Sequence, residues 1–518
     1  MLFRATLLLA TAATAFAQGT QPLQIRVETS NPTPLAPGFS GLNQAQPRDG
    51  VEYFDPKFVA ASIPMKAGWL RFPGGTVSLA YDWNPANPTG GHINPAWLND
   101  LVGGDPPLIT GQSVSILTVS QQLTQAKGGV YLSDFANFAK ALNASAIMTF
   151  NSYTDTNPES ATLMAQAAQS YGLNVLDWEL SNEADLYPNI YPTAGTYAST
   201  VYNPYYLNII GVSPGANVSL FSAGEFTGST VNTSLWDSQL SSYTPRYWNA
   251  SSLHIYPITE IVSAQTTIQT LNGILAHGST DYINSYLVPL VGAGTPIYIT
   301  EFNCCAQYGN KFLSYLYNGI FLAEYIMRLS SLPDVHAVGI NSLYTDNSDY
   351  HGLLQSVNDF EGYLIGQVTA NPNFSTNTAT NPNTQFQFYV SAPGLAMQVA
   401  NLAINSSANL WPTTVMGGLT VNIIGYDGQP IPSVYAQAYK ASNGANYLLI
   451  TNKAAEGQAA TLVVNGVQLK GNVTMTYVGN PSAIAANTAQ DQNNVQIQTK
   501  TSTNPIYLPA YSVTCVTL

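Results

Sequence analysis

The chain has 518 residues, and 45% of them are hydrophobic, which is enough for a sizeable core and argues against a disordered chain. Only 8% of the residues are charged and the formal net charge is −13. Nucleic acids and anionic membranes are therefore not expected as partners, because both are bound through basic patches. The length predicts two or three domains, or one large barrel with an addition, and the sequence indicates no oligomeric state.

Residues 1–17 predict a secretory signal peptide. They contain one early Arg, an apolar run of about ten residues and a small-residue cleavage site at Ala15-Phe16-Ala17. No later segment reaches the ~18 uncharged apolar residues of a membrane-spanning helix. We therefore expect a secreted, extracellular protein that is not anchored in a membrane. Sequons for N-linked glycans, usable if the host glycosylates secreted proteins, occur at Asn143, Asn217, Asn232, Asn249, Asn373, Asn405 and Asn472.

The cysteines do not form a disulfide framework. Cys304, Cys305 and Cys515 are too few for a scaffold, and their spacing matches no zinc motif. Either of the adjacent pair can bridge to Cys515, or the two can pair with each other. We expect one bridge and one buried thiol, with the pairing left open.

From Phe39 to about residue 365, strand-like runs alternate with helical or long loop segments. The runs are 40–43, 69–72, 146–151, 175–181, 220–224, 253–256, 297–300 and 337–343. Eight such alternations are typical of an α/β protein with a (β/α)8 barrel. The long insertion at 84–130, rich in Gly and Pro, follows the second run. We expect it over the mouth of the barrel, where substrate loops lie in this fold.

The C-terminal part has a different pattern. A polar linker rich in Asn, Thr and Pro at 371–384 leads into short alternating runs at a spacing typical of an antiparallel β-sandwich. The alternating strand at 23–28 has no barrel partner and is placed in this sandwich. The predicted organisation after the signal peptide is an N-terminal strand in 18–35, a catalytic barrel in 36–370 and a β-sandwich in 371–518.

Two glutamates end predicted barrel strands. Glu183 follows the apolar run 175–180, and Glu301 ends the run 296–300. A pair of carboxyl groups facing each other across a barrel mouth is the equipment of a retaining glycoside hydrolase. We assign Glu183 as acid/base and Glu301 as nucleophile, whose negative charge is expected to keep Glu183 protonated. Glu179 competes with Glu183 but lies inside the strand run, and Glu225 is a candidate substrate ligand.

Several neighbours of these glutamates have predicted supporting roles. Asn182 is placed to bind the 2-hydroxyl of a sugar, and Tyr256 to donate a hydrogen bond to Glu301. Arg71 is expected to pair with a buried carboxylate at the barrel mouth. His254 is interpreted as a core histidine rather than a catalyst.

These residues carry a family resemblance. Asn182-Glu183 and Glu301 resemble the catalytic pattern of the clan A glycoside hydrolases. Within that clan, the segments 70–76 (LRFPGGT) and 508–514 (LPAYSVT), with the barrel-plus-sandwich layout, resemble glycoside hydrolase family 79, which contains β-glucuronidases and heparanases. The resemblance implies retaining cleavage of terminal β-linked glucuronic acid from oligo- or polysaccharides, with no cofactor and no metal. Because the chain has no basic patch for heparan sulfate, it is similar to secreted exo-β-glucuronidases.

A glucuronide carries a carboxylate that needs donors in its pocket, because an unpaired buried charge is costly. The loop after Glu301 offers the Tyr308 hydroxyl, the Gly309 backbone N–H and the Lys311 ammonium. Arg71 and Arg48 are the rival cations.

Two alternative functions remain at this stage. One is another clan A hydrolase acting on neutral arabinosides, xylosides or glucosides. The other is a catalytically inactive carbohydrate-binding protein, although the trio of Asn182, Glu183 and Glu301 argues against it.

Overall fold

The computed structural model describes residues 21–223, 233–278, 280–307, 309–346, 349–371, 374 and 387–518. The predicted signal peptide and the candidate residues Glu225 and Tyr308 lie outside these ranges. Within them, no helix combines the length and the apolar character needed to cross a membrane.

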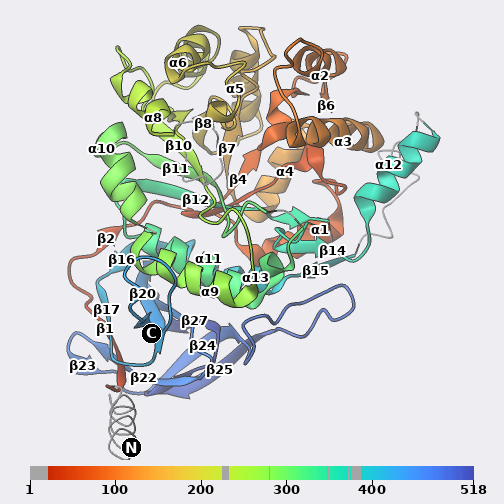
Figure 1. Cartoon of the computed structure of the whole chain (residues 1–518). Helices are drawn as coiled ribbons and strands as arrows, with labels where there is room; N and C mark the ends of the chain where they lie inside the picture. Colours follow the sequence, from red (N-terminus) through yellow and green to blue (C-terminus); the bar gives the residue numbers. More distant parts are fainter. Residues whose placement is uncertain are drawn as a thin grey trace, which may run out of the picture.

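Eight parallel strands close into a barrel in the order β10-β11-β12-β3-β4-β7-β8-β9 (Figure 1). Strands adjacent along the chain are thus adjacent in the barrel, and the last pairs with the first, as in a (β/α)8 fold. Each predicted run is found, with ends that differ by three residues at most, so the predicted fold class is confirmed. The strands are β3 (Ser40–Asn43), β4 (Trp69–Phe72), β7 (Ser145–Thr149), β8 (Val175–Glu179), β9 (Val218–Phe221), β10 (Ala250–Ile255), β11 (Ile297–Phe302) and β12 (Val335–Asn341).

Helices surround the barrel and follow most of its strands (Figure 1). Most of them bury apolar side chains, which is the main source of stability for helices of this length. They are α1 (Pro56–Ser62), α4 (Leu132–Leu142), α5 (Ser160–Ser170), α6 (Ala194–Val201), α7 (Leu207–Val212), α8 (Thr233–Ser242), α9 (Ala264–Gly273), α10 (Val288–Val291) and α11 (Leu316–Leu329). The insertion after β4 folds into α2 (Pro95–Val102) and α3 (Gln112–Lys127).

A buried cluster fills the barrel interior near the start of the strands and includes Trp69 of β4 and Tyr298 of β11. Trp69 of β4 is fully buried, and a Cβ atom at Gly41 or Gly339 would lie 2.1 or 2.2 Å from its ring. Glycine at these two positions therefore leaves the room that the indole occupies. Because side chains alternate along a strand, Arg71 faces the same interior two residues nearer the mouth. This places a buried cation directly beneath the candidate site.

Two antiparallel-rich sheets form the C-terminal sandwich, which lies below the barrel in Figure 1. As predicted, the N-terminal strand β1 (Leu23–Val27) belongs to it, pairing with β17 and β22. One sheet has the order β2-β16-β20-β21-β27-β24-β25, in which β2 spans Thr33–Pro34. The other contains β17-β1-β22-β23 with β26 beside β22, and β23 spans Val467–Gln468. The main strands are β16 (Ser407–Trp411), β17 (Thr413–Met416), β20 (Val434–Ala441), β21 (Asn446–Asn452), β22 (Gln458–Val464), β24 (Asn472–Gly479), β25 (Ile497–Thr503), β26 (Ile506–Leu508) and β27 (Ser512–Thr517).

Two further helices follow the barrel strands, α12 (Phe360–Ala370) and α13 (Ala392–Ile404). The sequence reading did not predict α13, which packs against α11 and the sandwich strand β27. The domain boundary at 370/371 stays a prediction. Cys304, Cys305 and Cys515 are all free and buried, so the disulfide expected from the sequence is not formed.

Candidate active site

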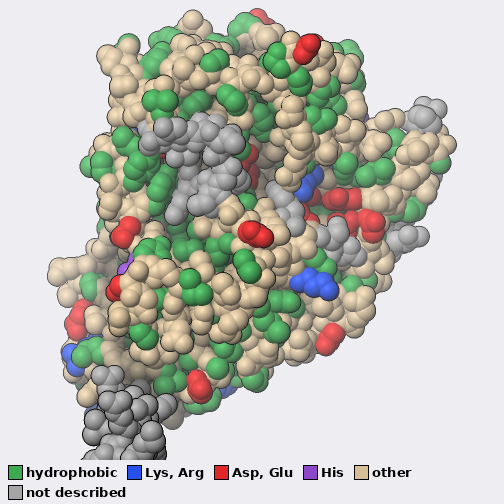
Figure 2. All heavy atoms as spheres, viewed as in Figure 1, with side chains coloured by type: hydrophobic (Ala, Val, Ile, Leu, Met, Phe, Trp, Pro, Cys, Tyr) green, Lys and Arg blue, Asp and Glu red, His purple; other side chains and the backbone are tan. Residues whose placement is uncertain are grey.

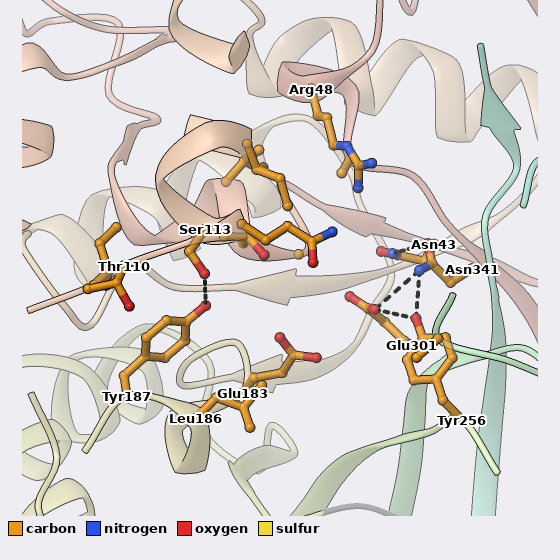
Figure 3. A pocket seen from close by; sticks show the side chains of 18 of the residues that line it. Asn43, Arg48, Thr110, Ser113, Glu183, Leu186, Tyr187, Tyr256, Glu301 and Asn341 are labelled. Carbon is orange, nitrogen blue, oxygen red and sulfur yellow. Dashed lines mark hydrogen bonds between the residues drawn. The ribbon is translucent and has the colours of Figure 1, made fainter. Parts of the chain in front are cut away.

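A cavity of about 400 Å³ opens at the carboxyl ends of the barrel strands, where active sites of this fold lie (Figure 3). Its volume is in the range of small-ligand sites. Glu183, Tyr256 and Glu301 all line it, and the predicted loop insertion contributes residues between Leu108 and Ile116. The expectation that this insertion covers the mouth is thereby confirmed.

Glu301 ends β11 and is held as an acceptor through both carboxylate oxygens. Arg71 Nη1 lies 2.7 Å from Oε1, and the Tyr256 hydroxyl donates to Oε2 at 2.7 Å. Asn341 Nδ2 donates to the same hydroxyl at 2.6 Å and lies 3.4 Å from Oε2. The residue is 6% exposed. A carboxylate with these donors is fixed in direction, which suits a nucleophile.

Glu183 lies four residues beyond the end of β8, at a sharp turn of the chain. Its φ is +52°, a left-handed conformation that non-glycine residues adopt mainly at constrained, often functional, positions. Its Oε1 lies 2.8 Å from His254 Nδ1, and its side chain is 16% exposed. Glu183 thus faces the cavity and keeps access to solvent, as an acid/base group needs.

The carboxylates of Glu183 and Glu301 face each other across the cavity (Figure 3). One oxygen of each, together with a ring nitrogen of His254, lies within a span of 4.8 Å. Retaining glycosidases separate their two carboxyl groups by about 5–5.5 Å, and inverting enzymes by about 6.5–9.5 Å. The three groups also offer a ligand set for a metal ion, but Arg71 already supplies positive charge to Glu301.

Arg71 and Glu179 form the floor beneath the cavity, and both side chains are fully buried. Arg71 donates to Glu179, which also accepts hydrogen bonds from Thr149 (2.8 Å) and Thr300 (2.7 Å). Burial alone would lower the pKa of Arg71, but the carboxylates of Glu179 and Glu301 raise it. Glu179 is therefore a partner of Arg71 below the cavity, and the competing assignment of Glu179 as the acid has no support in the geometry.

Asn182 connects this floor to the candidate acid. Its Oδ1 accepts from Arg71 Nη2 at 3.0 Å, and its Nδ2 donates to Glu183 Oε2 at 3.2 Å. The side chain is fully buried. In this structure the amide orients Glu183, and its predicted contact with a sugar 2-hydroxyl stays a prediction.

His254, interpreted from the sequence as a core histidine, lies beside both glutamates of the candidate site. It lies on β10, 2% exposed, with Nδ1 at 2.8 Å from Glu183 and 3.7 Å from Glu301. Burial alone would lower the pKa of His254, but the two carboxylates raise it. The sequence contains a sign of this position. His254 comes two residues before Tyr256, and alternate residues of an extended chain point to the same side, so His254 is expected on the side that carries Tyr256.

Two residues of the loop predicted to bind a substrate carboxylate, Gly309 and Lys311, do not line this cavity. Lys311 begins a short 3-10 helix (Lys311–Ser314), is exposed, and is not among the described residues that line the cavity. The Gly309 N–H donates to the backbone carbonyl of Asp349 at 3.2 Å, and Gly309 lines a neighbouring cavity. Tyr308 lies outside the described residues.

Solved structures resemble this chain closely in fold. An α-L-arabinofuranosidase from Thermotoga maritima in complex with arabinose matches with a TM-score of 0.66 and 16% identity, over 96% of this chain and 99% of that one. The GH51 arabinofuranosidase from Xanthomonas axonopodis pv. citri matches with a TM-score of 0.65 and 14% identity, over 96% and 99%. A 4-O-α-L-rhamnosyl-β-D-glucuronidase from Fusarium oxysporum 12S matches with a TM-score of 0.58 and 13% identity, over 96% and 100%.

No family model matches the sequence, and no curated protein does either. At these identities the structural likeness shows a shared fold. That fold, a (β/α)8 barrel joined to a β-sandwich, is one that glycoside hydrolases of several sugar classes use over almost their whole length.

Proposed function

We propose that this chain is a retaining glycoside hydrolase in which Glu301 is the nucleophile and Glu183 the acid/base. The observation that carries the proposal is the span of 4.8 Å that contains an oxygen of each glutamate at the bottom of one cavity. This separation leaves no room for the water that an inverting mechanism places between its two carboxyl groups. It also supports a working hydrolase over the alternative of an inactive carbohydrate-binding protein.

The reaction proceeds in two displacements. Glu301 attacks the anomeric carbon while Glu183 gives its proton to the glycosidic oxygen, so the leaving group departs as an alcohol and a glycosyl ester forms on Glu301. Water then attacks the same carbon, Glu183 takes a proton from it, and Glu301 is released as a carboxylate. Arg71 and Tyr256 hold the attacking carboxylate, and Asn182 and His254 hold the acid/base.

The substrate that we propose is a terminal β-linked glucuronic acid, removed by exo-action from an oligo- or polysaccharide. The resemblance in the segments 70–76 and 508–514 supports this choice, as does the fold shared with the glucuronidase from Fusarium oxysporum. The fold is equally shared with arabinofuranosidases. A neutral sugar is therefore the alternative that an experiment has to separate.

A panel of 4-nitrophenyl glycosides tests the proposal. The β-glucuronide should be cleaved with a kcat/KM at least about tenfold above those of the β-glucoside, β-xyloside and α-L-arabinofuranoside, since a matched carboxylate contact contributes more than one decade. Proton NMR should show the β-anomer of glucuronic acid as the first product. If the arabinofuranoside is the preferred substrate, the proposed specificity for glucuronic acid is wrong. If the protein binds glycans but cleaves no member of the panel, it is a carbohydrate-binding protein and not an enzyme.

A further inference from the structure

Arg48 is the cation that the structure brings to the candidate active site. It ends a 3-10 turn (Gln46–Arg48) just after β3. Of the described residues that line the cavity, it is the one with a Lys or Arg side chain. The side chain reaches toward the cavity from above Asn43 and Asn341 (Figure 3). Arg71, the other cation near the site, is fully buried below the floor and bonded to Glu179 and Glu301.

Buried hydrogen bonds hold the turn that carries Arg48 in place. Lys127 of α3 is fully buried and donates to the backbone carbonyls of Gln46 and Asp49. The side chain of Gln44 donates to the carboxylate of Asp49. A backbone held by such buried contacts presents its side chain in a defined direction, which is a requirement for a recognition residue.

The guanidinium itself is also oriented. Its Nη2 lies 3.3 Å from Asp349 Oδ2, and Asp349 is bound in turn by His351 Nδ1 at 2.5 Å. His351 Nε2 donates to the carbonyl of Cys305, in the loop after Glu301, at 3.2 Å. Burial alone would raise the pKa of Asp349, but His351 and Arg48 lower it. Asp349 therefore stays ionised and holds Arg48 in place.

The position of Arg48 matches one end of a bound sugar. The leaving group must lie beside Glu183, and Leu186 and Tyr187 line that side of the cavity (Figure 3). Once the anomeric carbon is over Glu301, the C4 and C5 substituents of a pyranose point away from the leaving group. In Figure 3 that direction leads toward Asn43, Asn341 and Arg48.

We propose that Arg48 binds the C5 carboxylate of the substrate and so determines specificity for a uronic acid. The inference rests on the proposed function, and it identifies the side chain that recognises the carboxylate of the proposed substrate. A guanidinium has five N–H donors in a planar fork, so it can donate hydrogen bonds to Asp349 and to a second carboxylate at the same time. This assignment replaces the Lys311 loop, whose ammonium does not line the cavity.

The acidic surroundings of Arg48 are compatible with an anionic substrate. A second cavity of about 340 Å³ shares Arg48 and Gln112 with the first and is lined by Asp49, Asp346, Asp349 and Glu361. Acidic side chains are seen in this hollow beside α12 in Figure 2. Burial raises the pKa of Asp49 to about 7 and also raises that of Glu361. Below about pH 7 Asp49 is therefore mainly neutral, and the raised pKa of Glu361 acts in the same direction, so these two acids offset the charge of Arg48 less.

The test compares Arg48→Gln with wild type on a matched pair of substrates, 4-nitrophenyl β-glucuronide and β-glucoside. We expect kcat/KM for the glucuronide to fall about 100-fold, mainly through KM, and that for the glucoside to change less than about threefold, because a lost charged contact of 2–3 kcal/mol corresponds to this factor. Inhibition by free glucuronate should weaken in parallel, and inhibition by glucose should not. Arg48→Lys should restore part of the loss, since charge returns without the fork.

Lys311→Met is the matched control, because it removes a cation from the exposed loop and should leave both substrates unaffected. A melting temperature within a few degrees of wild type shows that the Arg48 variants are folded. Equal losses on both substrates would assign Arg48 a structural role and overturn the inference alone. If the wild-type enzyme cleaves a neutral glycoside and no glucuronide, both the proposed substrate and the proposed role of Arg48 are wrong.

Discussion

The barrel mouth and the barrel–sandwich interface both bury carboxylates among cations, but with opposite charge balances. At the mouth, Glu179, Glu183 and Glu301 gather around Arg71 and His254. The carboxylates outnumber the permanent cation, and His254 lies within 3.7 Å of both cavity glutamates. Like charges gathered in this way disfavour one another's ionised forms, so such a cluster favours binding a proton.

At the interface the cations are in excess. Glu324 of α11 is bound by Lys453 at 2.6 Å and by Arg328 at 2.8 Å, with a further hydrogen bond from Thr451. The side chains of Glu324 and Lys453 are fully buried. Burial alone would raise the pKa of Glu324, but Lys453 and Arg328 lower it. The two cations therefore favour the ionised form of this carboxylate.

The difference separates a chemical role from a structural one. A carboxylate with surplus cations has no proton to exchange, and it fixes one part of the chain to another. A cluster short of cations keeps a mobile proton next to a cavity, which general acid/base catalysis needs. Burial and short ion pairs alone do not distinguish the two sites, whereas the balance of charge does.

The largest effect is expected for Glu301→Gln. The amide cannot form the glycosyl ester, so kcat should fall by at least about 10⁴-fold on every glycoside. Gln is similar in shape, and its single amide oxygen can still accept from Arg71. The melting temperature should therefore change little. Steady-state kinetics and thermal unfolding measure both quantities. Turnover within tenfold of wild type would assign the nucleophile to another residue.

Glu183→Ala should have the next largest effect, and one that depends on the leaving group. Substrates that need protonation should lose about 10²–10⁴-fold in kcat, and those with an activated aryl leaving group much less. Azide should rescue the variant, because it attacks the glycosyl enzyme without help from a base, and the product should be the β-azide. An Ala variant with full activity on an oligosaccharide would exclude Glu183 as the acid.

The sequence predicted the barrel well because its signals are local. Each strand is an apolar, β-rich run bounded by turn residues, and both glutamates come at the ends of such runs. Helix α13 was missed although Ser391 caps it and Pro393 occupies its first turn, since the preceding polar linker favoured a change to β-structure. The capping serine and the early proline are typical of a helix start, but the β-like segments on both sides favoured a strand.

The contacts that the sequence left open depend on tertiary structure. His254 faces Glu183 only because strands β8 and β10 curve around one barrel, and they are not adjacent in it. Arg48 and Asp349 are 301 residues apart in the chain and meet through loops at the ends of β3 and β12. Loop conformations are not encoded in periodicity, so the sequence could offer Arg48 and Lys311 only as rivals.

A third prediction concerns Glu324 at the barrel–sandwich interface. Glu324→Gln should lower the free energy of unfolding by about 3 kcal/mol, because it leaves the buried Lys453 without a counter-charge. Its kcat and KM should remain within about twofold of wild type, in contrast to the mouth variants. The double variant Glu324→Leu/Lys453→Met removes both charges and should recover part of the stability. If Glu324→Gln impairs catalysis without lowering stability, the contrast between the two sites fails.

The smallest effect is a dependence of stability on pH that comes from acids near the mouth. Burial raises the pKa of Asp185 to about 8 and that of Asp237 to about 7. Between the ordinary value for an Asp and these raised values, the folded protein binds more protons than the unfolded chain. The contribution of these groups is therefore complete below about pH 4 and is lost as the pH rises toward 8. Wild type should melt several degrees higher at pH 5 than at pH 8.

Asp237→Asn isolates one of these groups. The carboxylate of Asp237 accepts from the Ala223 N–H at 2.8 Å through Oδ1 and from the Tyr286 hydroxyl at 3.2 Å through Oδ2. An amide keeps the first contact as an acceptor and replaces the second by donating from Nδ2 to the Tyr286 oxygen. The variant should match wild type at pH 5 and exceed it by about 2 kcal/mol at pH 8, since the amide has no charge to bury. His92 and His336, whose pKa values burial lowers, act in the opposite direction in both proteins and cancel in the comparison. Parallel melting curves for the two proteins from pH 5 to 8 would show that Asp237 does not hold its proton in the folded state.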